Sequence, residues 1–258
     1  MRVRNVSILA GMTAFAMLSA MLTQAQTRPD FSGTWDHAQY IGASPTGPGS
    51  GEAAAERAGG IPRQGFSTEE PPMQPWAEAK YKEARQGTAS IYSSGGDEFD
   101  PTHSCFPHGM PRIYTTPRPF EVVMAPHMVA MLFEQDHWVR RIFTDGRGHP
   151  DGYPFSWMGH SDGKWDGNTL VVDTINIIPT SWWLDNLAHP KSDALHIVER
   201  IQRPEHETLQ IDFVFDDPKT YTRPWNGKKV FQLAPPHHIV LEDVICEDLL
   251  DLDKKGRY

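Results

Sequence analysis

The sequence predicts a mainly β protein in which an antiparallel meander of strands closes into a barrel, with one N-terminal helix and long loops. A series of segments after residue 111 is rich in strand-forming residues. Many of the links between them are only a few residues long, and short links require antiparallel neighbours. The chain lacks β-α-β alternation and a glycine-rich nucleotide loop, which argues against Rossmann and P-loop folds.

The first 25 residues have the features of a secretory signal peptide. Arg2 and Arg4 precede an apolar run over 6–22, and the small-residue sequence at 23–25 offers a cleavage site before Gln26. A retained membrane anchor is the alternative, although the apolar run is short for a span. We therefore expect a periplasmic or secreted protein that has no membrane contact after cleavage.

The chain contains two cysteines, Cys105 and Cys246. An even count in an oxidising compartment predicts one disulfide between them. Two free buried thiols are the first alternative. A metal site that combines Cys105 with His103 and His108 is the second, but no further Cys/His pair lies nearby at zinc spacing.

The remaining residues, 26–258, are expected to form a single domain. Residues 26–111 are rich in loops and contain one predicted helix over 75–85, with Pro75 in its first turn and Gly87 beyond its end. A Gly33-Thr34-Trp35 strand opens the domain. The predicted barrel strands lie within 112–245, at 112–115, 120–124, 127–134, 138–144, 157–165, 169–174, 194–203, 208–216, 229–233 and 238–244.

A strong hairpin signal lies at 157–174, where Asp166-Gly167-Asn168 joins two strands. His160 is expected in the middle of the first strand, beside Gly159, and glycine in a strand often marks a bulge or a close approach. We take His160 as the best candidate for chemistry. A hydrogen-bonded structural histidine is the alternative.

The strand over 194–203 buries an ionisable group whichever way it faces. His196 and Arg200 share one face, and Glu199 lies on the other with Leu195 and Ile197. If Glu199 faces the interior, desolvation raises its pKa and it becomes a candidate acid or base. An ordinary Glu199–Arg pair is the alternative.

Arg140 shares an apolar strand face with Trp138 and Ile142, where a guanidinium usually pairs with a carboxylate. Glu134 and Glu199 are possible protein partners, and a substrate carboxylate or enolate oxygen is the functional alternative. The long interruption at 176–193 contains Trp182, Trp183 and Asp185. It forms either a lid over the barrel mouth or a permanent plug.

His149, His160 and His196 could together form a three-histidine metal site, but their spacings of 11 and 36 residues would leave it dependent on the tertiary structure. Covalent catalysis is not supported, because no Gly-x-Ser-x-Gly elbow is present.

Several phrases of the sequence together resemble a large, mainly uncharacterised group of secreted bacterial proteins, with similarity over nearly all of the mature chain. They lie at 30–35, 118–121, 157–161, 165–174, 192–196, 216–218, 221–222 and 224–225. The resemblance implies a lipocalin-like barrel, whose opening Gly-x-Trp tryptophan plugs the closed end. It carries no activity over to any residue.

We expect an enzyme that performs acid–base chemistry on a small apolar or aromatic molecule, as a lyase, hydratase or isomerase without a cofactor. His160 would be the acid or base, assisted by Asp193, Glu199 or His196, with Arg140, Arg200, Trp182, Trp183 and Asp185 binding the substrate. The alternatives are a lipocalin-like carrier of a hydrophobic ligand and a metal-dependent hydrolase. A net charge of -9 argues against nucleic acid as a partner, and the oligomeric state is open.

Overall fold

The computed structural model describes residues 28–37, 64–86 and 100–235. The predicted signal peptide, Cys246 and the predicted strand at 238–244 lie outside the described residues. The signal peptide and the disulfide therefore stay predictions. In the described ranges, no helix has the length and apolar character needed to span a membrane.

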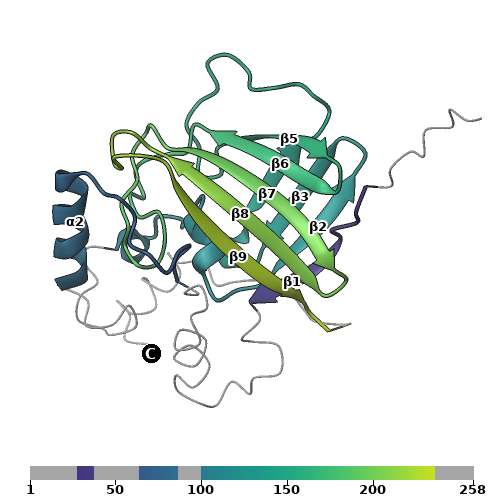
Figure 1. Cartoon of the computed structure of the whole chain (residues 1–258), viewed down its shortest axis with the longest axis horizontal. Coiled ribbons are helices and arrows are strands. Elements are labelled where there is room, and N and C mark those ends of the chain that lie inside the picture. Colours follow the sequence, from purple (N-terminus) through teal and green to yellow (C-terminus); the bar gives the residue numbers. More distant parts are fainter. Residues whose placement is uncertain (1–27, 38–63, 87–99, 236–258) are drawn as a thin grey trace, which may run out of the picture.

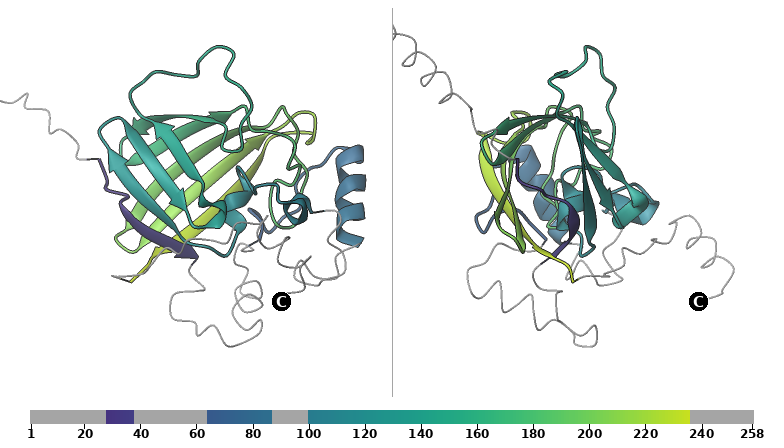
Figure 2. Two further views of the ribbon diagram at one scale, coloured as in Figure 1. Left: turned by 180° about the vertical axis from the view of Figure 1, so that it is seen from behind. Right: turned by 90° about the vertical axis from the view of Figure 1, so that its right-hand side faces the viewer.

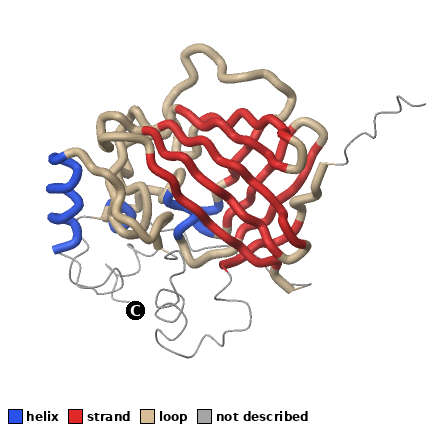
Figure 3. Tube along the Cα trace, viewed as in Figure 1, coloured by secondary structure: helices blue, strands red, loops and turns tan. Residues whose placement is uncertain are grey.

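In the part of the chain that the structure describes, nine strands form a closed barrel, which can be followed in Figures 1 and 3. Neighbours in the chain are neighbours in the barrel, and β1 closes it by pairing with both β2 and β9. The mainly β, barrel-forming prediction is confirmed. The strands are β1 (Gly33–His37), β2 (Phe120–Ala125), β3 (Met128–Phe133), β4 (Val139–Phe143), β5 (His160–Asp166), β6 (Thr169–Ile175), β7 (His196–Glu205), β8 (Thr208–Asp216) and β9 (Trp225–Leu233).

One strand pair corrects the prediction of an all-antiparallel meander. β4 and β5 are parallel, with Ile142 opposite Ser161 and Phe143 opposite Asp162. Parallel neighbours need a crossover that returns the chain to the starting end. Residues 144–159 form this crossover, and they arch above β5 at the top of Figure 1 and stand clear of the barrel in both views of Figure 2.

The β5–β6 hairpin forms where the Asp-Gly signal predicts it. Asp166 pairs with Thr169, so Gly167 and Asn168 make a two-residue turn, and Gly167 has a φ of 60°. The start of β5 differs from the prediction: the strand begins at His160, not at 157. Gly159 has a φ of 65°, which strand residues do not adopt, and this ends the preceding segment.

The predicted strand at 112–115 is wrong, because these residues form a 3₁₀ helix, η3 (Arg112–Thr115). Two hydroxyls stabilise the helical turn: Thr115 Oγ1 donates to the carbonyl of Arg112 at 2.7 Å, and Thr116 Oγ1 to that of Ile113 at 2.8 Å. The helix directs Tyr114 into the barrel, where the side chain is fully buried.

Aromatic side chains fill much of the barrel interior. The Phe120 ring lies 5.2 Å from that of Phe133 and 4.9 Å from that of Phe231, and Tyr114 packs at 5.7 Å from Phe213. Trp35 of the predicted Gly-x-Trp strand is completely buried, and its Nε1 donates to the carbonyl of Phe31. The interior is therefore a packed core along much of its length.

The predicted helix at 75–85 is confirmed as α2 (Pro75–Gln86), which lies beyond one end of the barrel in Figure 1. The interruption at 176–193 lies at the same end. Leu184 and Asp185 are completely buried and Trp183 is 2% exposed, packed with Ala84 of α2. This burial favours a plug over a mobile lid.

Candidate functional site

Three histidines and an aspartate meet on the outside of the barrel wall. We name this set, His149, His160, Asp173 and His196, the outer-wall cluster. Ser161 and Thr174 face inward, where both bond Arg140, so the residues next to them on β5 and β6 must face outward. The hairpin register places Asp162 opposite Asp173 and His160 opposite Ile175, and His196 joins from the neighbouring β7.

Hydrogen bonds link the outer-wall cluster into one chain. His160 Nδ1 lies 2.8 Å from His149 Nδ1. His149 Nε2 lies 2.9 Å from Asp173 Oδ1, and His196 Nε2 lies 3.0 Å from Asp173 Oδ2. The carboxylate of Asp173 therefore bridges two imidazoles, and one of these reaches the third.

The order of donors and acceptors follows from the carboxylate. An ionised Asp173 only accepts, so His149 and His196 each donate from Nε2. The bond between His149 Nδ1 and His160 Nδ1 needs one donor and one acceptor, and in the tautomer in which His149 carries its proton on Nε2 alone, His149 accepts and His160 donates. This arrangement leaves a lone pair on Nδ1 of His196, and none of the described residues bonds that atom.

The two ends of this hydrogen-bonded row of side chains differ in exposure. His160 is buried at 3% exposure, and burial, followed by the neighbouring His149, lowers its pKa and so favours the neutral ring. The side chains of His196 and Asp173 are 38% and 44% exposed. A molecule from solution therefore meets His196 and Asp173 first, and His160 forms the inner end.

The crossover and its neighbours hold the inner end in place. His160 stacks on Phe143 at 5.5 Å and meets the edge of Tyr153 at 4.7 Å. Asn176 Nδ2 donates to the Tyr153 carbonyl at 2.7 Å and so ties the crossover to the end of β6. An added Cβ on Gly159 would lie 2.6 Å from the Ile175 carbonyl, so only glycine fits before His160.

A second ionisable group lies inside the barrel and is separate from the first. Arg140 and Glu199 are both completely buried and form a bidentate pair. Arg140 also donates to Tyr114 Oη at 2.6 Å, to Thr174 Oγ1 at 2.9 Å and to Ser161 Oγ at 3.1 Å. Burial alone would lower the pKa of Arg140, but Glu199 and then Tyr114 raise it, so the guanidinium stays charged.

The side-chain directions decide between the two predicted faces of β7. Glu199 faces inward and pairs with Arg140, while His196 and Arg200 face outward. Glu199 therefore forms the ordinary ion pair with an arginine of the protein, which the sequence predicts as the alternative to an acid–base role. The polar partners of Arg140 are Glu199, Tyr114, Ser161 and Thr174, and the Glu199 side chain points into the barrel, away from the outer-wall cluster.

The other predicted residues have their own partners outside the outer-wall cluster. Asp193 pairs with Lys219 at 2.6 Å, and Arg200 pairs with Asp166 at 3.0 Å, both on the surface. Asp185 is buried against His189, with 2.7 Å between Oδ2 and Nδ1. Trp182 lies under Lys80, and Trp183 lies under Arg112, at the plugged end.

The three histidines of the metal alternative meet as a chain and not at a point. His149 uses Nδ1 toward His160 and Nε2 toward Asp173, so the nitrogens of His160 and His196 lie at opposite ends of the chain. Within the described ranges, no group of three or more His, Cys, Asp or Glu side chains is arranged to hold a metal ion. A metal site here would need these rings to rotate.

Asp173 is the member that sequence reasoning missed, although a signal for it was present. A two-residue turn at Gly167-Asn168 sets the register of the hairpin, and that register puts Asp173 diagonally across from His160. His149 could be named as a candidate but not placed, because its position depends on the path of the crossover.

Comparisons of the chain with models of protein families, with curated proteins and with solved structures find no match. The barrel and the outer-wall cluster therefore define the class: a closed β-barrel with a hydrogen-bonded His–Asp–His arrangement on its outer wall. Any statement of activity is a proposal from this geometry.

Proposed function

We propose that the protein is an enzyme that moves a proton on a small apolar or aromatic molecule, as a lyase, hydratase or isomerase, with His196 as the acid–base residue. The observation that carries the proposal is the bridging of two imidazoles by Asp173, with the side chain of His196 38% exposed. A carboxylate that accepts from one ring nitrogen orients the imidazole and stabilises the imidazolium that forms.

In the proposed reaction, Nδ1 of His196 removes a proton from a carbon beside a carbonyl group. The electron pair of the broken C–H bond moves toward the carbonyl oxygen, and the imidazolium is stabilised by Asp173. The proton then returns to a neighbouring carbon in an isomerase, or to a leaving oxygen in a lyase or hydratase. Each outcome balances without an external oxidant or reductant.

The inner two histidines act as positioning residues in this proposal. His149 donates to the second oxygen of Asp173 and keeps that carboxylate aimed at His196. His160 donates to His149 and selects its tautomer. In this proposal His160 is no longer the reacting residue, because its burial keeps it from molecules in solution. It instead orients the hydrogen-bonded side chains of the outer-wall cluster.

The proposed location is a secreted or periplasmic one, on the strength of the N-terminal sequence alone. A carrier of a hydrophobic ligand inside the barrel is the less favoured function. The inner wall holds a charged pair and interlocking aromatic rings where such a ligand would bind.

The proposal is tested by solvent exchange, which needs no knowledge of the product. Neutral aryl ketones are incubated with the protein in D₂O, and deuterium at the carbon beside the carbonyl is followed by NMR. We expect His196→Ala and Asp173→Asn to slow wild-type exchange by roughly 10²–10⁴-fold, the usual contribution of general acid–base catalysis.

His206→Ala is the control, because His206 is an exposed histidine at the β7–β8 turn whose imidazole pairs with Glu207 and lies outside the outer-wall cluster. It should leave the exchange rate unchanged. A wild-type rate no higher than that of a folded His196→Ala protein would refute the proposed function.

A further inference from the structure

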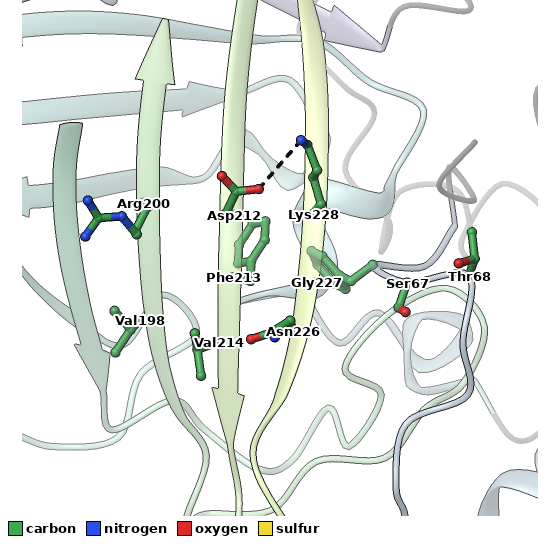
Figure 4. Close-up of a pocket in the computed structure, with 11 residues that line it drawn as sticks. Ser67, Thr68, Val198, Arg200, Asp212, Phe213, Val214, Asn226, Gly227 and Lys228 are labelled. Atoms are coloured by element: carbon green, nitrogen blue, oxygen red, sulfur yellow. Dashed lines mark ion pairs between the residues drawn. The ribbon is translucent and has the colours of Figure 1, made fainter. Parts of the chain in front are cut away.

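A groove lies on the outer wall of β7, β8 and β9, beside the outer-wall cluster. It encloses about 510 Å³, within the range of about 300–1,000 Å³ usual for small-molecule sites. Residues 66–68 form one side of it, because the carbonyl of Phe66 accepts from the amide of Lys228 at 2.7 Å and anchors this segment along β9. Figure 4 shows the lining side chains.

The strand register sets the floor of the groove as two rows. The first row crosses the strands as Val198, Val214 and Asn226, and the second as Arg200, Asp212 and Lys228. Both rows can be followed from left to right in Figure 4. The first row is mainly apolar, and Val214 is 40% exposed although it belongs to a barrel strand.

The same register joins the groove to the outer-wall cluster. Asp173 pairs directly with Val198, so the first row of the groove continues into the carboxylate. Paired residues on one face have Cβ atoms about 5 Å apart. His196 precedes Val198 by two residues on the same strand face, a separation of roughly 7 Å. A molecule lying on Val198 and Val214 would present one end to His196.

The charges of the groove are already paired. Arg200 is bonded to Asp166 at 3.0 Å, and Lys228 lies 3.8 Å from Asp212. Asp166 lies outside the groove, at the β5–β6 turn, so the groove itself is lined by two positive groups and one negative group, and each positive group already has a carboxylate partner. Hydrogen-bonding capacity remains: none of the described residues bonds the amide of Asn226, and Arg200 has further N–H groups besides the one that meets Asp166.

From these features we infer that the groove binds the substrate of the proposed reaction, and that this substrate is a neutral molecule with an apolar or aromatic body and a carbonyl group. The inference rests on the proposed function. The body lies on Val198 and Val214 with Ser67 and Thr68 at the side of the groove, and the carbonyl end points toward His196 and Asp173. Asn226 hydrogen-bonds a neutral polar group at the far end.

Three probes with the same aromatic body test the inference: 2-acetylnaphthalene, which is neutral, 2-naphthoate, an anion, and 2-(aminomethyl)naphthalene, a cation at pH 7. Binding to the full chain is measured by isothermal titration calorimetry. We expect the neutral ketone to bind at least fivefold more tightly than either ion. Val214→Glu should weaken its binding at least tenfold, because a carboxylate then projects into the apolar floor.

Val139→Glu is the matched control, since Val139 is an exposed valine on the outer face of β4, 38% exposed, and does not line the groove. It should leave the Kd unchanged within twofold. Equal effects of Val139→Glu and Val214→Glu, tighter binding of either ion, or binding of none of the three probes would each overturn the inference.

The same ketone separates this inference from the proposed function. Its methyl protons report exchange in D₂O, and His196→Ala should slow this exchange by roughly 10²–10⁴-fold while the Kd stays within twofold. Binding that depends on Val214 without any exchange would support the groove and refute the reaction. Exchange that depends on His196 but is unaffected by Val214→Glu would support the reaction and refute the groove.

Discussion

The buried pair of Arg140 and Glu199 allows a quantitative test of how the barrel interior is stabilised. The perturbation is Glu199→Gln, which keeps the shape of the side chain and removes its charge. The guanidinium of Arg140 then remains completely buried with no counter-charge. Removing one partner of such a pair costs about 3–5 kcal/mol. For a domain of this size, each kcal/mol lowers Tm by about 2–4 °C, so the fall should be about 6–20 °C.

The assay is urea unfolding followed by tryptophan fluorescence and circular dichroism, with the free energy taken from the midpoint and the slope. The double variant Arg140→Met/Glu199→Leu should recover most of the loss, because an apolar replacement of both charges is often neutral or stabilising. Asp166→Asn is the control: it breaks the exposed pair with Arg200, in which the Asp166 side chain is 70% exposed, and should cost about 1 kcal/mol or less.

A loss below about 1 kcal/mol in Glu199→Gln would contradict the reasoning, since it would mean that the guanidinium finds other compensation. A double variant as unstable as the single one would also contradict it. The first result would show that the bonds of Arg140 to hydroxyl groups compensate its charge without the carboxylate, and the second that apolar side chains do not replace the pair.

Three further predictions concern the crossover and the plugged end. Gly159→Ala should destabilise the fold by more than about 2 kcal/mol in urea unfolding, because the added Cβ meets a backbone carbonyl of β6. Gly152→Ala is the control: Gly152 is also at positive φ but lies in open space, so this change should cost about 1 kcal/mol. Equal costs for the two variants would exclude a steric clash as the cause. Burial would lower the pKa of His189, but Asp185 raises it to about 9, above the unfolded value of 6.5, so His189 contributes on the order of 3 kcal/mol below pH 6.5 that is lost as pH rises through 9. The stability difference between wild type and His189→Gln should therefore shrink between pH 6 and 9.5, and a constant difference would refute the shift. Burial lowers the pKa of Lys191 to about 7, against 10.5 in the unfolded chain, so between these pH values the unfolded chain binds one proton more than the folded chain. In the His189→Gln background the free energy of unfolding should therefore rise with pH from 7 to 9.5. A flat profile over this range would contradict the lowered pKa of Lys191.

Much of the fold follows from local patterns. The period-two alternation and the short links predict a barrel of neighbouring strands, and the Asp-Gly turn predicts the β5–β6 hairpin in its observed register. The helix at α2 follows from Pro75 and a run of good helix formers. The strand prediction at 112–115 fails for a local reason: the hydroxyls of Thr115 and Thr116 bond back to preceding carbonyls and stabilise a 3₁₀ helix. A short segment with β-branched residues does not show from its sequence whether it will form a strand or this helix.

The candidate site could be predicted only in part. His160 and His196 stand out as ionisable residues on predicted strands, but alternation alone does not tell which face of a strand points into the barrel. Glu199 and His196 were therefore equally plausible as interior groups. The ion pair with Arg140 decides that Glu199 is the residue that faces inward, because a buried guanidinium needs a carboxylate partner.

The sequence by itself determined most of the strands, the main hairpin, the helix and the identity of the chemically active residue types, because these depend on neighbours within a few positions. Only the tertiary structure decided that β4 and β5 run parallel, and therefore that a crossover passes over the outer wall and carries His149 to His160. It also decided that Asp173 links His149 to His196, since contacts between residues 23 or more positions apart depend on how the barrel closes.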